Sequence, residues 1–263
     1  MDLRAPSDDD VHDVHRALLD HGVLFFRDQP LDDDEHLLLA SRFGEPALFP
    51  LVERFVGSGN PLGYITDSPE SPPDADGWHT DITWIEQPPK LAFLQAIRIP
   101  ERGGDTMWAD LYAAYDSLSD AMRALCARLS VVHTISPVIV EAFRERVGDE
   151  VADKIAVEFP PVVHPLVRVH PETGRDALFV AGEFMTAIDG MHLDESAVLL
   201  TFLKRHIENP NLHVRWSWRP RDLAIWDERC TNHRALSDHY PQYREMRRCT
   251  VKGDRPVGPE SPR

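Results

Sequence analysis

Short strand-like segments separated by turns dominate this sequence from its middle onward. Several are apolar or partly alternating, as expected for strands with a face in a core: residues 90–99 (KLAFLQAIRI), 222–227 (DLAIWD) and 244–254 (REMRRCTVKGD). Nothing in the sequence alternates strand and helix around a glycine-rich phosphate loop, which disfavours a doubly wound parallel sheet. We therefore predict a mainly β fold with flanking helices, a jelly-roll or cupin-like double-stranded β-helix barrel whose mouth can hold a ligand.

Helices are expected at the N-terminus and as insertions. An amphipathic run at residues 11–22 follows the acidic stretch 7–10, and residues 32–35 open a second helix that ends near Gly44. Further helices are predicted over 110–129 and 195–208. Further strands are predicted over 23–28, 81–85 and 212–219, and as a hairpin of 162–170 with 176–182.

The length of 263 residues suits a single large core. We predict one domain over residues 1–252. Residues 46–77, which are rich in Pro, Gly, Ser and Asp, and the less regular residues 136–161 are expected to be mobile loops over the active site. The Pro-rich tail 253–263 is expected to be disordered.

The charge balance restricts the partners. With 28 basic and 44 acidic side chains the formal net charge is −16, which disfavours nucleic acid and anionic membrane surfaces. No run of 18 apolar residues occurs, the N-terminus is acidic, and the three cysteines are widely spaced, so a cytoplasmic protein is expected. An anionic small molecule would need arginines inside its own site.

The strongest chemical signal is Trp78-His79-Thr80-Asp81. Side chains two apart on an extended segment point the same way and can share a metal ion, and a distal histidine would complete the set. Two imidazoles and one carboxylate are typical of non-haem Fe(II) oxygenases. An H-x-D triplet alone is weak, because it can also be a polar strand edge. His233, after the strand 222–227, is the candidate third ligand.

Two arginines follow His233 in a strand-like segment. Arg244 and Arg248 are four residues apart, so on a strand their side chains point to the same side. A guanidinium binds a carboxylate through two parallel hydrogen bonds. A metal with guanidinium groups beside it suits an oxygen-rich, doubly anionic small molecule.

These residues lie within a wider set of motifs: GWHTDITW (77–84), GGDTMWAD (103–110), HPLVRVHPETGRDALFV (164–180) and VRWSWRPRDLAIWDERCTNHRA (214–235), followed by Arg244 and Arg248. Through them nearly the whole chain resembles the taurine dioxygenase (TauD/TfdA) family of Fe(II)- and 2-oxoglutarate-dependent oxygenases. The resemblance implies that His79, Asp81 and His233 bind iron. It also implies that Thr106 and Arg244 hold the distal carboxylate of 2-oxoglutarate, that O2 is the oxidant, and that Arg248 binds the anionic group of the substrate.

Where taurine dioxygenases place polar side chains around their substrate, alignment to the family puts Phe49, Val52 and Ala75, with Ile82 and Phe184 as further expected walls. The expected substrate is therefore an apolar small molecule with an anionic group, for example a terpenoid carboxylic acid of secondary metabolism. Hydroxylation, desaturation and related C–H oxidations all stay open.

Several alternatives also stay open. Within the family, the chain could be an alkylsulfatase or a sulfonate dioxygenase. Outside it, the alternatives are a zinc hydrolase, which has no use for the pair Thr106 and Arg244, and a non-catalytic cupin-like metal- or ligand-binding protein. Family membership also implies a homo-oligomer, either a dimer or a tetramer.

Overall fold

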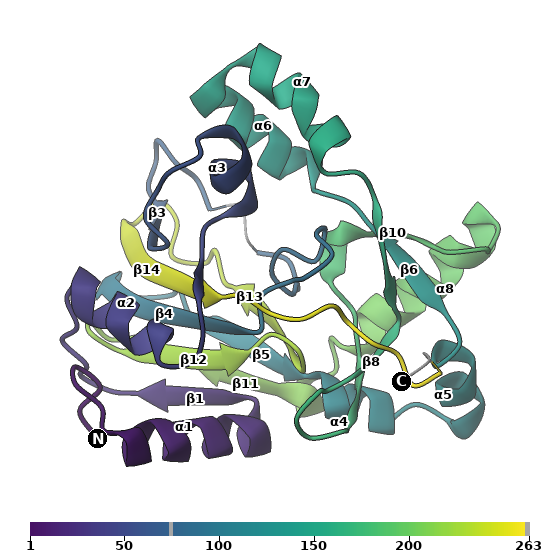
Figure 1. Ribbon diagram of the computed structural model, residues 1–263, viewed down its shortest axis with the longest axis horizontal. Coiled ribbons are helices and arrows are strands. Elements are labelled where there is room, and N and C mark those ends of the chain that lie inside the picture. The colour runs from purple at the N-terminus through teal and green to yellow at the C-terminus, as the bar shows by residue number, and fades with distance from the viewer. Residues whose placement is uncertain (74–75, 261–263) are drawn as a thin grey trace.

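The computed structural model describes residues 1–73 and 76–260, and its centre is built from two sheets (Figure 1). The larger sheet has six strands in the order β1-β12-β4-β14-β2, with β3 also paired to β14. Its strands are β1 (Val23–Phe26), β2 (Pro46–Ala47), β3 (Gly63–Asp67), β4 (Leu91–Arg98), β12 (Leu223–Asp227) and β14 (Arg244–Val251). The smaller sheet has the order β11-β5-β13, from β11 (His213–Trp216), β5 (Thr106–Asp110) and β13 (Thr231–Ala235). All of these pairings are antiparallel.

The alternation of side chains along β4 divides the core around the large sheet. Leu91 and Phe93 belong to an outer cluster with helices α1 (Asp8–His21) and α2 (Asp33–Ser41). Leu94 and its inward-facing neighbours belong to an inner cluster with Trp108 of the smaller sheet. Successive strand residues face opposite sides, so the large sheet is buried on both faces. The two sheets therefore face each other across the inner cluster.

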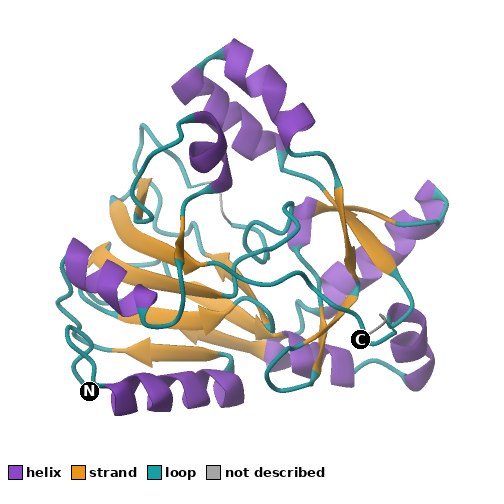
Figure 2. Ribbon diagram, viewed as in Figure 1, coloured by secondary structure: helices purple, strands orange, loops and turns teal. Residues whose placement is uncertain are grey.

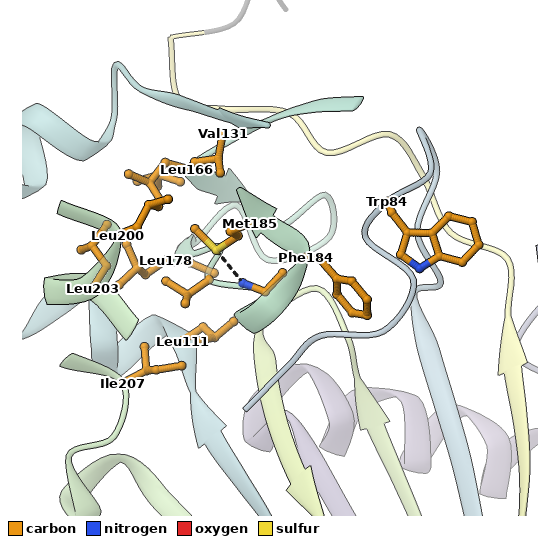
Figure 3. Packing of buried hydrophobic residues seen from close by; sticks show 14 of the residues in the cluster. Trp84, Leu111, Val131, Leu166, Leu178, Phe184, Met185, Leu200, Leu203 and Ile207 are labelled. Carbon is orange, nitrogen blue, oxygen red and sulfur yellow. Dashed lines mark hydrogen bonds between the residues drawn. The ribbon is translucent and has the colours of Figure 1, made fainter. Parts of the chain in front are cut away.

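A third region carries its own core. It contains the sheet β10-β6-β7, from β6 (Ser130–His133), β7 (Val162–Pro165) and β10 (Met185–Ile188), and the hairpin of β8 (Val167–Val169) and β9 (Asp176–Leu178). Around them lie α4 (Leu111–Asp116), α5 (Asp120–Cys126), α8 (Leu193–His206) and the 3₁₀ turns Gly182–Phe184 and Pro210–Leu212. Figure 3 shows Leu178, Leu200 and Leu203 packed together there.

Three helices form a cover above the sheets: α3 (Pro50–Phe55), α6 (Pro137–Val147) and α7 (Asp149–Glu158) (Figure 2). The ring of Phe55 lies 6.2 Å from that of Phe143 and 6.3 Å from that of Phe159. An ion pair of 2.5 Å joins Arg54 to Glu158. Aromatic contacts and an ion pair thus join α3 to the helical hairpin α6–α7.

Several local predictions were wrong. The segments 46–77 and 136–161 hold helices, because Pro50 and Pro137 begin α3 and α6, where a missing N–H costs nothing. The predicted helix 110–129 is two helices, since the Ser119 hydroxyl accepts the Met122 N–H and begins the second. Residues 81–84 form turns instead of a strand.

The C-terminal residues that the structure describes, 253–260, lie against the body of the protein. Asp254 pairs with the buried Arg168 at 2.9 Å, and the Val169 N–H donates to the Val257 carbonyl. Within the described residues, no helix has both the length and the apolar character needed to cross a membrane.

Candidate active site

His79, Asp81 and His233 lie together where the chain before β4 meets β13. The backbones of His79 and His233 exchange two hydrogen bonds, of 2.9 and 2.8 Å, which fixes the two rings side by side. His79 Nε2 lies 3.7 Å and His233 Nε2 3.9 Å from Asp81 Oδ1. The three ligand atoms all lie within 4.8 Å of one another, a separation that one metal ion can bridge.

The surroundings of the two histidines suit metal binding. His79 Nδ1 donates to the Gly77 carbonyl at 2.8 Å, which leaves the lone pair on Nε2. His233 is held by packing, with its ring 4.9 Å from that of Trp226. Two neutral imidazoles and one carboxylate fit Fe(II) and leave positions for other ligands.

The Asp81 carboxylate is buried but stays ionised. Burial alone would raise its pKa, but Arg248, then His233 and His79, lower the pKa below its ordinary value. Arg248 Nη2 lies 2.7 Å from Asp81 Oδ2. Burial, and after it His79, lowers the pKa of His233 well below its usual range, so His233 stays neutral and able to bind a metal.

A further carboxyl group lies behind Asp81. Glu228, which is fully buried, accepts the Asp81 N–H at 3.1 Å and the Trp226 indole N–H at 2.7 Å. Burial, followed by the charge of Asp81, raises the pKa of Glu228 well above its ordinary value. Glu228 thereby fixes the backbone of a metal-site residue.

The turn after Asp81 is held from outside the two main sheets. Ile82 has φ +54°, a left-handed conformation that is strained for a β-branched residue. His164 Nε2 contacts the carbonyls of Thr83 and Ile85 at 2.9 and 3.0 Å, and His133 Nδ1 lies 2.9 Å from the Thr83 hydroxyl. Two buried histidines thus fix the turn that presents Asp81 and Ile82.

A cavity on one side of the metal group contains Thr106 and Arg244. Its lining includes His79, His233, Trp226 and Arg248. Thr106, the first residue of β5, is buried and accepts the Trp218 indole N–H at 3.0 Å. Arg244, the first residue of β14, is only 3% exposed. The sheets therefore bring a hydroxyl and a guanidinium into one pocket with the metal group.

A hollow that is partly open to solvent also borders the metal group, through His79 and Asp81. Phe49, Ile82, Phe184 and Arg248 line it together with Trp84, and Figure 3 shows Trp84 and Phe184 on neighbouring segments. Val52 lines a second hollow, which shares Phe49, Ile82 and Arg248 with the first. Ala75 lies outside the described residues. Arg248 thus borders both hollows and the pocket of Arg244.

The family model of the taurine catabolism dioxygenase TauD, TfdA family matches residues 1–250. The chain belongs to the TauD/TfdA family. The match covers nearly the whole chain and includes the metal-capable group of His79, Asp81 and His233.

Two curated TauD/TfdA relatives are similar over most of their length. An alkylsulfatase of Acinetobacter baylyi is 35% identical over 253 residues, covering 94% of this chain and 78% of the relative. An alpha-ketoglutarate-dependent sulfate ester dioxygenase of Pseudomonas putida is 36% identical, with 94% and 82% covered. The crystal structure of a taurine dioxygenase from Burkholderia xenovorans superposes with a TM-score of 0.83 at 34% identity, covering all of this chain and 88% of that one.

A second group of metal-capable side chains lies away from this site: His170, Asp227 and Cys230, all buried. His170 Nδ1 accepts the N–H groups of Glu172 and Thr173, so Nε2 carries the proton and donates to Asp227 at 3.1 Å. Burial raises the pKa of the Cys230 thiol well above its ordinary value. This group is a closed structural network.

Four acidic or basic residues around the site were not predicted. Glu228 lies within the motif of residues 214–235, but no role was predicted for it. Asp67 and His239 line the pocket of Arg244, and Glu183 lines the hollow beside Phe184. Asp67 lies in a segment predicted to be a loop, so nothing in the local pattern placed it beside Arg244. Asp67 lies opposite Arg244 because β3 pairs with β14, which no local sequence motif indicates.

Proposed function

We propose that this protein is an Fe(II)- and 2-oxoglutarate-dependent dioxygenase that oxidises an apolar small molecule bearing one anionic group. His79, Asp81 and His233 would hold the iron, and Thr106 and Arg244 the distal carboxylate of 2-oxoglutarate. The observation that carries the proposal is the continuous lining around Arg248, which borders the metal group, the pocket of Arg244 and the apolar hollows. The facing sheets are proposed to be the two walls of a double-stranded β-helix.

When bound, iron supplies the centre at which O2 is activated as 2-oxoglutarate is converted to succinate and CO2. The contributions of the chain are binding and orientation. Arg244 and Thr106 fix one end of the co-substrate, so that its 2-oxo acid end lies toward the metal group. Residues of α3 and α6 line the hollows, and these helices would limit the access of water during turnover.

The walls of the hollows define the expected substrate. Phe49, Val52, Ile82 and Phe184 favour a hydrocarbon body, which gains about 25 cal/mol for each Å² of apolar surface it buries. Arg248 would bind the anionic group. Glu183 on the same wall would repel a second anionic group, which supports a monoanion.

A sulfate ester with an alkyl body is the favoured substrate, because the two relatives described above are named for sulfate ester chemistry. Insertion of one oxygen atom at the carbon that bears the ester oxygen gives an unstable product. That product loses hydrogen sulfate and leaves an aldehyde. The other oxygen atom of O2 enters succinate as 2-oxoglutarate loses CO2. An apolar carboxylic acid is the second candidate, since a guanidinium binds a carboxylate equally well.

The test is iron- and O2-dependent succinate formation with four matched additions: octyl sulfate, octanesulfonate, octanoate and taurine. We expect octyl sulfate to stimulate succinate formation most, with equimolar sulfate and octanal, and taurine least. A zinc hydrolase would release sulfate without O2 or succinate, and a binding protein would form neither product. Efficient taurine turnover would overturn the substrate proposal.

Arg248 provides a sharper test of substrate binding. Arg248→Lys keeps the positive charge beside Asp81 but removes the two-pronged donor. We expect it to raise the KM for octyl sulfate, while substrate-free conversion of 2-oxoglutarate continues. An unchanged KM would remove Arg248 from substrate binding.

A further inference from the structure

The Thr106 hydroxyl of the co-substrate pocket is held from behind by an indole. Trp218 Nε1 donates to Thr106 Oγ1 at 3.0 Å, and the two residues are 6% and 1% exposed. An indole N–H can only donate, whereas a hydroxyl has one proton and two lone pairs. Thr106 Oγ1 is therefore the acceptor in this bond, and its own proton is left for another partner.

The free proton of this hydroxyl lies on the side of the pocket. Within the described residues, the Thr106 hydroxyl forms no second hydrogen bond. Thr106 lines the pocket that also contains Arg244, whereas Trp218 belongs to the inner cluster with Trp108. Because the lone pair that faces the core is occupied, the hydroxyl can donate into the pocket, where a carboxylate would accept its proton.

The pairing of β11 with β5 brings the indole behind the hydroxyl. Trp216 is the cross-strand partner of Thr106, and Trp218, two residues later, packs in the same inner cluster. Ser217, between them, faces the other way, and its hydroxyl donates to Asp105 Oδ2 at 2.9 Å. Alternate side chains of this segment thus hold two successive residues, Asp105 and Thr106.

We propose that Trp218 is a positioning residue of the co-substrate pocket. Its N–H fixes the orientation of the Thr106 hydroxyl, so that the hydroxyl donates to the same carboxylate that Arg244 binds. A hydroxyl that rotates freely would lose that freedom when the carboxylate enters, and binding would be weaker. This inference rests on the proposed function, which assigns Thr106 and Arg244 to the distal carboxylate of 2-oxoglutarate.

The test is a double-mutant cycle of Trp218→Phe and Thr106→Val. The Kd of 2-oxoglutarate is measured by calorimetry on the full chain, with Mn(II) in place of iron and without substrate. Trp108→Phe is the matched control variant, since Trp108 is 1% exposed in the same cluster but its indole N–H has no hydrogen-bond partner among the described residues. 2-Oxovalerate, which has a methyl group in place of the distal carboxylate, is the control ligand.

Thr106→Val should raise the Kd of 2-oxoglutarate about fivefold, the loss expected for one hydrogen bond. Trp218→Phe should raise it about three- to fivefold, because the hydroxyl is kept but no longer oriented. The double variant should bind no more weakly than Thr106→Val, since both changes act through one hydroxyl. Trp108→Phe with 2-oxoglutarate, and every variant with 2-oxovalerate, should stay within about twofold of the wild type.

Thr106→Ser gives a second readout that leaves the tryptophan core intact. Serine lacks the methyl group that restricts rotation about χ1, so the orientation of its hydroxyl depends more on the Trp218 N–H. Thr106→Ser should bind 2-oxoglutarate within about twofold of the wild type, and about fivefold more weakly once Trp218→Phe is added.

Multiplied losses in the double variant, about 15- to 25-fold, would overturn the proposal. So would an unchanged Kd in Trp218→Phe or Thr106→Val, or a loss in Trp108→Phe as large as that in Trp218→Phe. Failure of the proposed function gives a different result. If the wild type binds 2-oxoglutarate and 2-oxovalerate with equal Kd, the pocket does not hold the distal carboxylate, whatever the outcome of the cycle.

Discussion

Two clusters in this protein contain nearly the same residue types but differ in whether their ligand atoms are free to bind a metal. His79, Asp81 and His233 form one, and His170, Asp227 and Cys230 form the other. In the first, His79 uses Nδ1 for a backbone carbonyl and keeps the lone pair of Nε2. In the second, both ring nitrogens of His170 are engaged by other groups. A metal site thus depends on free lone pairs more than on which residue types meet.

The positive partners of the two aspartates differ in the same way. Arg248, which pairs with Asp81, is 25% exposed and borders three hollows, so it can share its charge with another anion. Arg229 is 4% exposed and grips Asp227 through Nε and Nη2 at 2.8 and 2.6 Å. The first pair is open to a ligand, and the second is permanent.

The largest expected effect is the loss of activity when a residue of the first cluster is replaced. Replacing His79, Asp81 or His233 with Ala should abolish 2-oxoglutarate conversion, because each loss should exceed the roughly 10–100-fold typical of groups that only support a metal ligand. Circular dichroism should show a retained fold. Succinate formation at wild-type rate in any of the three variants would remove the metal assignment.

The next effect tests the pocket beside the first cluster. Arg244→Ala should weaken 2-oxoglutarate binding by about 3–5 kcal/mol, roughly 150- to 4,000-fold, because a buried carboxylate loses its partner. Thr106→Ala removes one hydroxyl and should cost about 1 kcal/mol. Calorimetry with Mn(II) measures both. A larger loss for Thr106→Ala than for Arg244→Ala would show that the guanidinium is not the main anchor.

The second cluster should respond through stability. Asp227→Asn leaves the buried Arg229 with only the partly exposed Glu172 as a carboxylate partner, so the free energy of unfolding should fall by about 3 kcal/mol. Urea denaturation measures this change. The Kd of 2-oxoglutarate in the folded variant should be unchanged, and a strong loss of co-substrate affinity without loss of stability would contradict the structural role.

A smaller effect on stability concerns two buried histidines, His133 behind the turn of Asp81 and His36 under the large sheet. Burial lowers the pKa of His133 to about 3 and that of His36 to about 4, from 6.5. Below pH 6.5 these histidines become protonated in the unfolded chain but stay neutral in the native state. The free energy of unfolding therefore falls as the pH drops toward the native pKa values. At pH 5 each of the two histidines should lower the free energy of unfolding by about 2 kcal/mol. Urea midpoints of the wild type at pH 7 and 5, compared with those of His36→Gln, measure this loss; an equal loss in the variant would exclude His36.

The residue patterns predicted what depends on local spacing. His79 and Asp81 are two residues apart, so this pair of metal ligands could be found directly from the sequence. The apolar pattern of β4 and β12 likewise identified these segments as core strands. Asp67 and His239 could not, because they meet Arg244 only through the pairing of β3 with β14 and the chain path after β13. Helix α3 was missed because the Pro- and Gly-rich composition of residues 46–77 was taken as a loop signal, and α6 because residues 136–161 showed no regular pattern, although a proline begins each helix.

The central claim is that the first cluster binds a metal and the second does not. Its most direct test is the number of Mn(II) ions bound, by calorimetry, to the wild type, Asp81→Ala and Asp227→Asn at a temperature where all three are folded. The account predicts one ion for the wild type and for Asp227→Asn, and none for Asp81→Ala. Retention of the ion by Asp81→Ala together with its loss from Asp227→Asn would contradict it.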